Sequence, residues 1–269
     1  MPDASKSLSI ITPTLNSEGF IDDCINNVIA QGPSVLEHII VDGGSTDGTI
    51  AKVEHLQERL PHLRLIRGPD RGQSDAMNKG TQAARGDVIG ILNVDDYYEA
   101  GAATSALAEL ELLREPAVVV GDCRVIHENG DLNFWNRPSN LQIEALLLGW
   151  QYAQFPCNPS AYFYHRSVHD LVGGFDIGDH YAMDFDFLLR CARHVRMKHV
   201  PRHWGNFRLA PGCKTYQDEQ GPRRIAAIIA HHMDDIGPVG RLKVNLTKAR
   251  IDFNRFRRAK VRRLLMNPA

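Results

Sequence analysis

The sequence lacks any long hydrophobic run. No apolar stretch in its 269 residues approaches the ~20 residues that a membrane-spanning helix needs. The opening MPDASKSLSI contains an acid and no extended apolar segment, so we expect no secretory signal there. The five cysteines are odd in number and form no CxxC pair. They indicate neither a disulfide framework nor a zinc ribbon, and we expect reduced thiols in a cytoplasmic protein.

Zinc-ligand patterns are also absent. Three histidine pairs have close spacing, but no HExxH motif or further ligand set accompanies them. We therefore expect surface histidines in all three pairs, which are His165 with His169, His199 with His203, and His231 with His232.

The known phosphate-binding loops are missing as well. The segment VDGGSTDGT (41–49) has suitable glycines, but Thr49 stands where a Walker loop has lysine, and the glycines miss the GxGxxG spacing. We interpret it as a tight turn in which Thr46 or Asp47 caps the next helix. We also expect Asp42 to face a ligand crevice.

Charge is unevenly distributed along the chain. The formal net charge is −1, yet residues 241–263 contain ten Lys or Arg and one acid, which leaves 21 basic and 31 acidic residues elsewhere. This asymmetry predicts an anionic partner for the C-terminal segment.

Short apolar runs alternate with helix-like stretches in the first half, which predicts right-handed βαβ units and a mainly parallel sheet. We expect strands at 8–12, 36–42, 63–68 and 87–93, and helices at 18–30, 47–60 and 74–84. Beyond residue 98 we expect helices at 102–114, 140–148 and 181–193, a strand at 159–164, and a strand after 117 followed by a hairpin turn at Asn129–Gly130.

The predicted strands end in polar or glycine-rich residues. Ligands of open parallel sheets bind beyond the carboxyl ends of the strands, so these ends should converge on one site. The fourth ends in NVDD, where Asp95 and Asp96 are suited to hold a hard divalent cation that bridges a diphosphate. Taken alone, the two acids would more often form a solvated turn; the other strand ends favour the cation site.

A second acidic motif, MDFDFLLR (183–190), lies in an apolar helical stretch. Asp184 and Asp186 point about 200° apart on a helix, so both cannot face the core. One can be a catalytic base and the other a solvated or helix-terminal charge, and composition alone does not choose between them.

Together these motifs resemble the family 2 glycosyltransferases with the GT-A fold. The matching blocks run in family order over residues 8–213: SIITPTLN, VDGGSTDGT, PDRGQSDAMNKG, GDVIGILNVDDYY, NPSAYFYHRSV, VGGFD and YAMDFDFLLR. The resemblance implies an α/β fold with a Rossmann-like, mainly parallel central sheet flanked by helices, a small antiparallel element and a C-terminal helical tail. It implies a GT-A domain over 1–213, with a nucleotide-binding half (1–98) and an acceptor half (99–213), followed by the basic tail (214–269).

The same resemblance implies an inverting hexosyltransferase-type enzyme of polysaccharide or glycolipid assembly. Asp184 matches the family's base, and Asp95 and Asp96 match its DXD-type block for Mn²⁺ or Mg²⁺. The matching positions for the nucleotide-diphospho-sugar donor are Thr12, Pro13, Thr14, Asn16, Asp42, Gly44, Ser45, Asp70, Gly72, Asp75, Asn78, Asn93, Val94 and Asp95.

Two positions depart from the family pattern. Many members have a second acid where this chain has Gly43, at a place that contacts the nucleotide base. Many also have a histidine where this chain has Ala210, within FRLAPG. A non-catalytic nucleotide-sugar-binding module and another nucleotide-using transferase therefore stay as alternatives.

The tail has two alternative roles. Leu242, Leu246, Ala249, Phe253 and Phe256 have helical spacing among basic residues. Such a helix can lie on an anionic membrane surface, which would suit a lipid-linked acceptor at the inner membrane face, or it can pack its apolar stripe on the domain. Nucleic acid is not an expected partner, since the body is acidic and no reader fold appears.

Overall fold

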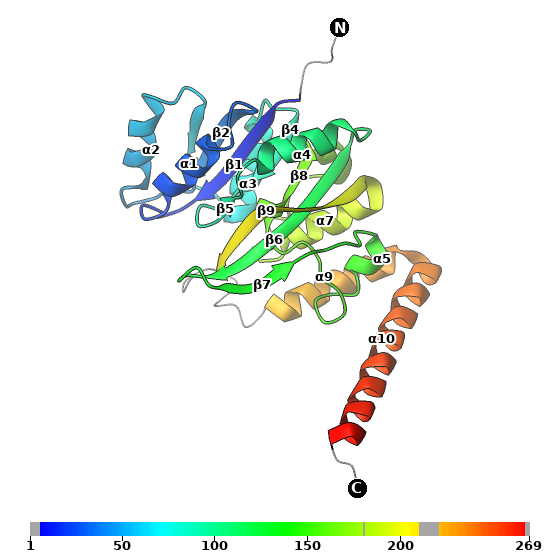
Figure 1. Cartoon of the computed structure of the whole chain (residues 1–269). Helices are drawn as coiled ribbons and strands as arrows, with labels where there is room; N and C mark the ends of the chain where they lie inside the picture. Colours follow the sequence, from blue (N-terminus) through cyan, green and yellow to red (C-terminus); the bar gives the residue numbers. More distant parts are fainter. Residues whose placement is uncertain (1–5, 180, 210–220, 267–269) are drawn as a thin grey trace.

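The computed structural model describes residues 6–179, 181–209 and 221–266 (Figure 1). Its strands are β1 (Leu8–Thr14), β2 (Val35–Asp42), β3 (Leu63–Arg67), β4 (Val88–Ile91), β5 (Tyr97–Tyr98), β6 (Ala117–His127), β7 (Leu132–Asn136), β8 (Tyr162–His165) and β9 (Arg196–Leu209). Its helices are α1 (Ile21–Ile29), α2 (Thr49–Gln57), α3 (Gln73–Ala83), α4 (Ala102–Glu111), α5 (Ile143–Leu146), the 3₁₀ turn η1 (Pro159–Ala161), α6 (Val168–Val172), α7 (Met183–His194), α9 (Gly221–Asp235) and α10 (Gly237–Met266).

The four N-terminal strands form the parallel sheet that the alternating pattern predicts. β1 pairs in parallel with β2 on one side and β4 on the other, and β3 extends the sheet beyond β2. Every residue of β1 is buried because the sheet is covered on both faces: Ile10 packs into one core cluster and Ile11 into another. This double burial explains why the strand is apolar without alternation.

The second half of the chain continues the same sheet, in the order β3-β2-β1-β4-β8-β6-β9-β5. β8 is antiparallel to both β4 and β6, while β6 and β9 run parallel. β7 pairs with β6 across the Asn129–Gly130 turn, which confirms the predicted hairpin. The two halves of the sequence are therefore joined through one continuous sheet rather than through a linker.

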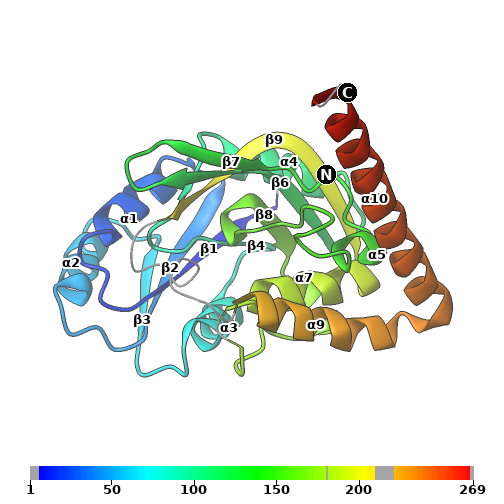
Figure 2. The ribbon, with the colours of Figure 1, turned by 90° about the horizontal axis from the view of Figure 1, so that it is seen from below.

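Helices cover both faces of this sheet. One face carries α3, α6 and α7, whose apolar side chains share a core cluster with β1, β4 and β8. The other carries α1 and α4, which pack on β1, β4 and β6, and α2 completes the cover beside β2. Viewed from below, α9 runs along α3 and α7, and α10 stands at the edge of the molecule (Figure 2).

Several sequence predictions need correction. Only Ile143–Leu146 of the expected helix at 140–148 is α-helical, and the expected strand at 159–164 begins with η1, where Asn158 accepts a hydrogen bond from the Ser160 amide. β9 was not predicted at all, because its sequence RMKHVPRHWGNFRL mixes charged and aromatic residues without an apolar run.

The surface histidines are a further correction. His165 and His232 are buried, at 0% and 2% exposure, and His169 stacks on Phe187. These histidines are held by packing or by hydrogen bonds: the Ala117 amide, for example, donates to His165 Nδ1. His199 and His203 are partly buried, and His231 is exposed as predicted.

Candidate active site

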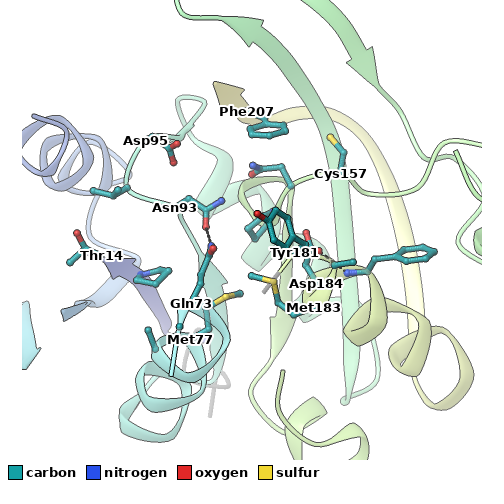
Figure 3. A pocket seen from close by; sticks show the side chains of 18 of the residues that line it. Thr14, Gln73, Met77, Asn93, Asp95, Cys157, Tyr181, Met183, Asp184 and Phe207 are labelled. Carbon is teal, nitrogen blue, oxygen red and sulfur yellow. Dashed lines mark hydrogen bonds between the residues drawn. The ribbon is translucent and has the colours of Figure 1, made fainter. Parts of the chain in front are cut away.

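A cavity of about 660 Å³ opens at the carboxyl ends of β1 and β4 (Figure 3). One wall consists of residues 13–17 and 93–95, which follow those strands, together with the start of α3. The opposite wall comes from residues 150, 155–159 and 181–185, and Phe207 and Ile225 also line the cavity. Both halves of the chain thus contribute to one site. Of the polar strand ends that were expected to converge, those of β1, β3 and β4 reach the cavity, whereas that of β2 does not.

The structure brings nine of the predicted site residues to this cavity. They are Pro13, Thr14, Asn16, Asp70, Gly72, Asn93, Val94, Asp95 and Asp184. A smaller neighbouring cavity of about 260 Å³ also reaches Asp95 and contains Asp96. The remaining predicted residues do not line the main cavity: Thr12, Asp42, Gly44, Ser45, Asp75 and Asn78.

Those remaining residues hold the cavity wall from behind. Thr12 is buried, and its hydroxyl bonds to His38 Nε2 at 2.9 Å. The buried Asp42 carboxylate accepts from the Gly44 and Ser45 amides at 3.0 and 2.8 Å, and from the Ser45 hydroxyl. Asp42 therefore shapes the loop after β2 instead of facing the crevice.

The loop after β2 is in turn bonded to the loop after β1. The Asn16 amide donates to the Ser45 hydroxyl at 2.7 Å, and the Thr46 amide donates to Asn16 Oδ1 at 2.8 Å. Asn16 adopts a positive φ of 51°, a conformation that asparagine tolerates better than most residues. These bonds fix Asn16 at the cavity wall.

Asp75 and Asn78 position α3. Asp75 accepts from the Arg71 amide at 3.0 Å and pairs with Lys79 at 3.2 Å; the Arg71 hydrogen bond is the main reason that the pKa of Asp75 lies below its usual value. The Asn78 side chain bonds to both the amide and the carbonyl of Phe175 at 2.8 Å. α3 is thereby tied to the chain segment that leads into α7.

Asp70 occupies the space beside Gly43. A Cβ atom built on Gly43 would overlap the Asp70 carboxylate, so a side chain at position 43 could not coexist with Asp70 in its present place. Asp70 Oδ1 also accepts from the Gly72 amide at 2.9 Å. Asp70, from the loop after β3, therefore lies in the space that a side chain at position 43 would take.

The adjacent acids Asp95 and Asp96 have different surroundings. Asp96 is buried and accepts three hydrogen bonds: from Asn93 Nδ2 at 2.9 Å, Asn158 Nδ2 at 2.7 Å and the Arg208 amide at 2.9 Å. Asp95 instead lines both cavities, and burial raises its pKa. Of the two, Asp95 is the carboxylate that is open to a ligand.

Asp184 lies in the first turn of α7, on the cavity wall opposite Asp95 (Figure 3). Burial raises its pKa to about 6, against the opposing effect of hydrogen bonds such as that from the Phe185 amide, at 2.8 Å. A carboxylate that is short of donors and has a pKa near neutrality is suited to accept a proton.

Asp186, two residues further along α7, points away from the cavity. Its carboxylate pairs with Arg190 Nε and with His232 Nε2 of α9, both at 2.8 Å. Composition left open which of the two acids faces a ligand. In the structure Asp184 lines the cavity, while Asp186 links α7 to α9 through His232.

The cavity residues that the sequence did not predict are mainly apolar or amide side chains, and most of them belong to the wall that contains Asp184. Gln73 Nε2 donates to Asn93 Oδ1 at 2.8 Å and so fixes the orientation of that amide (Figure 3). Other lining residues that were not predicted are Met77, Trp150, Phe155, Cys157, Asn158, Tyr181, Met183, Phe207 and Ile225. Apart from family motifs, no sequence signal marks them, since loops and parts of α3, α7, α9 and β9 come together only in the folded chain.

The acids can be tested against the needs of a divalent cation. No group of three or more His, Cys, Asp or Glu that could hold a metal ion occurs among the described residues. Mg²⁺ and similar ions at phosphate sites are, however, commonly bound by one or two carboxylates together with the substrate's phosphates. Asp95 fits this mode, while the three donors on Asp96 make it a supporting residue.

Comparison with known proteins identifies the fold and the family. A family model described as "Glycosyl transferase family 2" matches residues 9–173. A PGL/p-HBAD biosynthesis glycosyltransferase of Mycobacterium bovis is 29% identical over 198 residues, which is 70% of either chain. A chondroitin synthase of Pasteurella multocida is 28% identical over 197 residues, or 72% of this chain and 20% of that protein. The chain thus spans about a fifth of the length of that synthase.

Solved structures agree on the architecture. Residues 1–349 of S. aureus TarS in complex with UDP-GlcNAc superpose with a TM-score of 0.65 at 18% identity, covering 84% of this chain and 66% of that one. The mannosyltransferase PcManGT of Pyrobaculum calidifontis, in complex with GDP-Man and Mn²⁺, gives 0.58 at 20% identity, covering 93% and 71%. The α/β fold with a curled, mainly parallel sheet is therefore the GT-A fold that the sequence predicts.

Proposed function

The chain belongs to glycosyltransferase family 2, and from this premise we propose that it transfers a hexose from a nucleotide-diphospho-sugar to a hydroxyl group, with inversion at the anomeric carbon. The observation that carries the proposal is the placement of Asp184 and Asp95 on opposite walls of one cavity. A base on one side and a diphosphate site on the other are the two parts that a direct displacement needs. The acceptor is a sugar or a lipid-linked sugar of cell-surface polysaccharide or glycolipid assembly, and we propose a cytoplasmic location.

The residues of this chain supply the proton transfer. Asp184 accepts the proton of the acceptor hydroxyl as the acceptor oxygen bonds to the anomeric carbon. The bond from that carbon to the β-phosphate oxygen breaks, and its electron pair leaves with the nucleoside diphosphate. Because Asp184 acts once and forms no covalent intermediate, the new glycosidic bond has the opposite anomeric configuration.

We assign donor binding to the cavity wall formed by residues 13–17, residues 93–95 and the start of α3. Thr14, Asn16 and Asn93 line the nucleoside side, and Asp95 would hold Mn²⁺ or Mg²⁺ beside the diphosphate. When bound, the ion acts as a Lewis acid that stabilises the charge on the leaving diphosphate. Hydrogen bonds to Gln73 and Asp96 hold the side-chain amide of Asn93 in one orientation. Donor binding therefore does not have to order this amide.

We assign the missing base contact to Asp70. Its carboxylate stands where a side chain on Gly43 would project, and it lines the cavity. A carboxylate at this place can accept a hydrogen bond from an N–H group of the nucleotide base, as the acid at the Gly43 position does in many members of the family.

A thermal-shift screen of nucleotide sugars tests the proposal. The true donor should raise the melting temperature in the presence of Mn²⁺, since ligand at 100 times its Kd stabilises a fold by about 2.7 kcal/mol. The shift should shrink with EDTA and disappear in Asp95→Ala. A chain that responds to no nucleotide sugar, with or without Mn²⁺, would contradict the proposal.

A further inference from the structure

The helix α10 is attached to the body along one face only. Val244, 1% exposed, packs into the core cluster that includes α5 and α7. On either flank of Val244, about 100° or less around the helix, Lys243 pairs with Glu144 of α5 at 3.4 Å and the Tyr152 hydroxyl donates to Asp252 at 3.0 Å. Beyond these contacts the helix projects away from the domain (Figure 1).

A row of apolar side chains occupies the opposite face of α10. We call it the outer stripe; it consists of Val239, Leu242, Leu246, Phe253 and Phe256, which are 59–69% exposed. At roughly 100° per residue, these positions fall within an arc of roughly 100° whose centre is about 170° from Val244. The alternative that this stripe packs on the domain is therefore wrong, because the domain is on the other side.

Basic residues flank the outer stripe. Lys243, Arg250 and Arg257 are seven residues apart, so they form a second row along one edge of it. Residues 241–263 contain ten Lys or Arg and a single acid, Asp252, which already bonds to Tyr152. An apolar row of Leu and Phe beside cations is typical of helices that lie in the interface of a membrane.

A second copy of the chain is the other occupant that this spacing could suit, since helix pairs also use intervals of three and four residues. Pairing two such helices would, however, bring together two strongly basic surfaces with almost no acidic partners. A bilayer with anionic lipids would neutralise the cations and also cover the outer stripe. No helix in the described part of the chain is long and apolar enough to cross a membrane.

We propose that α10 docks in the plane of an anionic lipid bilayer, with the outer stripe buried among the acyl chains and the basic row at the phosphates. The helix adjoins residues 150–152, and Trp150 also lines the acceptor side of the cavity. This docking would bring that side of the cavity close to the membrane. If the proposed function is correct, a lipid-linked acceptor would be found there.

Vesicle co-sedimentation of the full chain tests the docking without any need for turnover. The chain should bind vesicles of phosphatidylcholine and phosphatidylglycerol (3:1) at least tenfold more tightly than pure phosphatidylcholine. Leu242→Ser/Leu246→Ser should reduce that binding at least tenfold. Leu112→Ser/Leu171→Ser is the matched control, since both leucines are exposed and lie away from α10, and it should bind as the unmodified chain does.

Two further measurements test the role of the basic residues and the alternative that the chain self-associates through α10. Arg250→Glu/Arg257→Glu should abolish the preference for anionic vesicles while the melting temperature stays unchanged, because neither arginine contacts the body in the described part of the chain; Lys243 is left in place because it pairs with Glu144. Equal vesicle binding by the chain and its Leu242→Ser/Leu246→Ser variant would overturn the proposal. So would a dimer in sedimentation velocity that this variant dissociates, combined with no vesicle binding. Because none of these readings depends on sugar transfer, a failure of the proposed function would leave them interpretable.

Discussion

The acids of the cavity region differ mainly in how many donors each carboxylate has. Asp42 and Asp96 each accept three hydrogen bonds, while Asp184 lies on the cavity wall with few donors and a pKa raised to about 6. A carboxylate saturated with donors organises the backbone around it; one that is desolvated and open can take a proton. The difference between structural and chemical acids is thus visible residue by residue.

The raised pKa of Asp184 predicts a pH-dependent cost to the fold. The native state binds the proton of this acid more tightly than the unfolded chain, so stability falls as the pH rises from about 4 to about 6 and stays lower above that. Asp184→Asn removes the charge. We expect it to raise the free energy of unfolding by about 1–2 kcal/mol at pH 7.5 and by little at pH 4.5. Denaturant unfolding at the two pH values measures this; an equal effect at both would contradict the pKa assignment.

The contrast between Asp95 and Asp96 predicts opposite phenotypes. Asp96→Ala would leave three buried donors without their acceptor and should cost about 2–4 kcal/mol of stability. Asp95→Ala should change stability little but weaken donor binding in Mn²⁺ at least tenfold. Differential scanning calorimetry and titration calorimetry with the donor found by screening separate the two effects. Reversed phenotypes would show that Asp96, not Asp95, is the ligand-facing acid.

At the scale of elements, α9 acts as a clamp on the helix that carries Asp184. His232 is buried and bonds to Asp186, while Ile225 of the same helix lines the cavity. Fixing α9 to α7 therefore fixes the position of Ile225 in the cavity wall relative to Asp184. The length of α9 from Ile225 to His232, two helical turns, spans the distance between these two contacts.

This clamp predicts different effects for two adjacent histidines. His232→Ala removes one partner of the buried Asp186 carboxylate and should cost about 1–3 kcal/mol of stability. His231→Ala is a matched control, because His231 is exposed, and it should stay within about 0.5 kcal/mol of the unmodified chain. Thermal unfolding of both variants measures the difference. Equal melting temperatures would mean that the hydrogen bond between His232 and Asp186 does not hold α9 in place.

Elements were predictable from the sequence where periodicity was strong. β1, β2, α3 and the β6–β7 hairpin follow from apolar runs, helical spacing and the Asn129–Gly130 turn. β9 escaped prediction because ten of its fourteen residues are exposed or partly exposed, and its place is set by pairing with the distant β6. Short, loop-bound elements such as α5 and η1 depend on local hydrogen bonds that no periodicity encodes.

At the scale of the whole molecule, one sheet joins the two halves of the sequence. The carboxyl ends of β1 and β4 place Asn16, Asn93 and Asp95 on one wall, as parallel-sheet topology predicts. Asp184 could be placed opposite them only through the family motif, because no local pattern states which face of α7 meets the cavity. The apolar residues Trp150 and Ile225 could not be anticipated, since tertiary packing alone brings them there.

Charge is also arranged at this scale. The acidic body and the basic residues 241–263 are separated along the chain, and the outer stripe of α10 faces away from the body. Sequence could not decide between packing and docking for this stripe, because both predict the same spacing. The structure excludes packing on the domain, because Val244 holds the opposite face of the helix against it; docking is what we propose.

In the proposed reaction, Asp184 takes the proton of the acceptor hydroxyl during a nucleotide-sugar-dependent transfer. The most direct test of this step is the rate of nucleoside diphosphate release from the donor in Mn²⁺ at pH 7.5, compared between the unmodified chain and Asp184→Asn, with the exposed Asp170→Asn as control. We predict a loss of roughly 10²–10⁴-fold for Asp184→Asn with donor affinity retained, and none for the control. Full transfer activity in a folded Asp184→Asn protein would contradict the account.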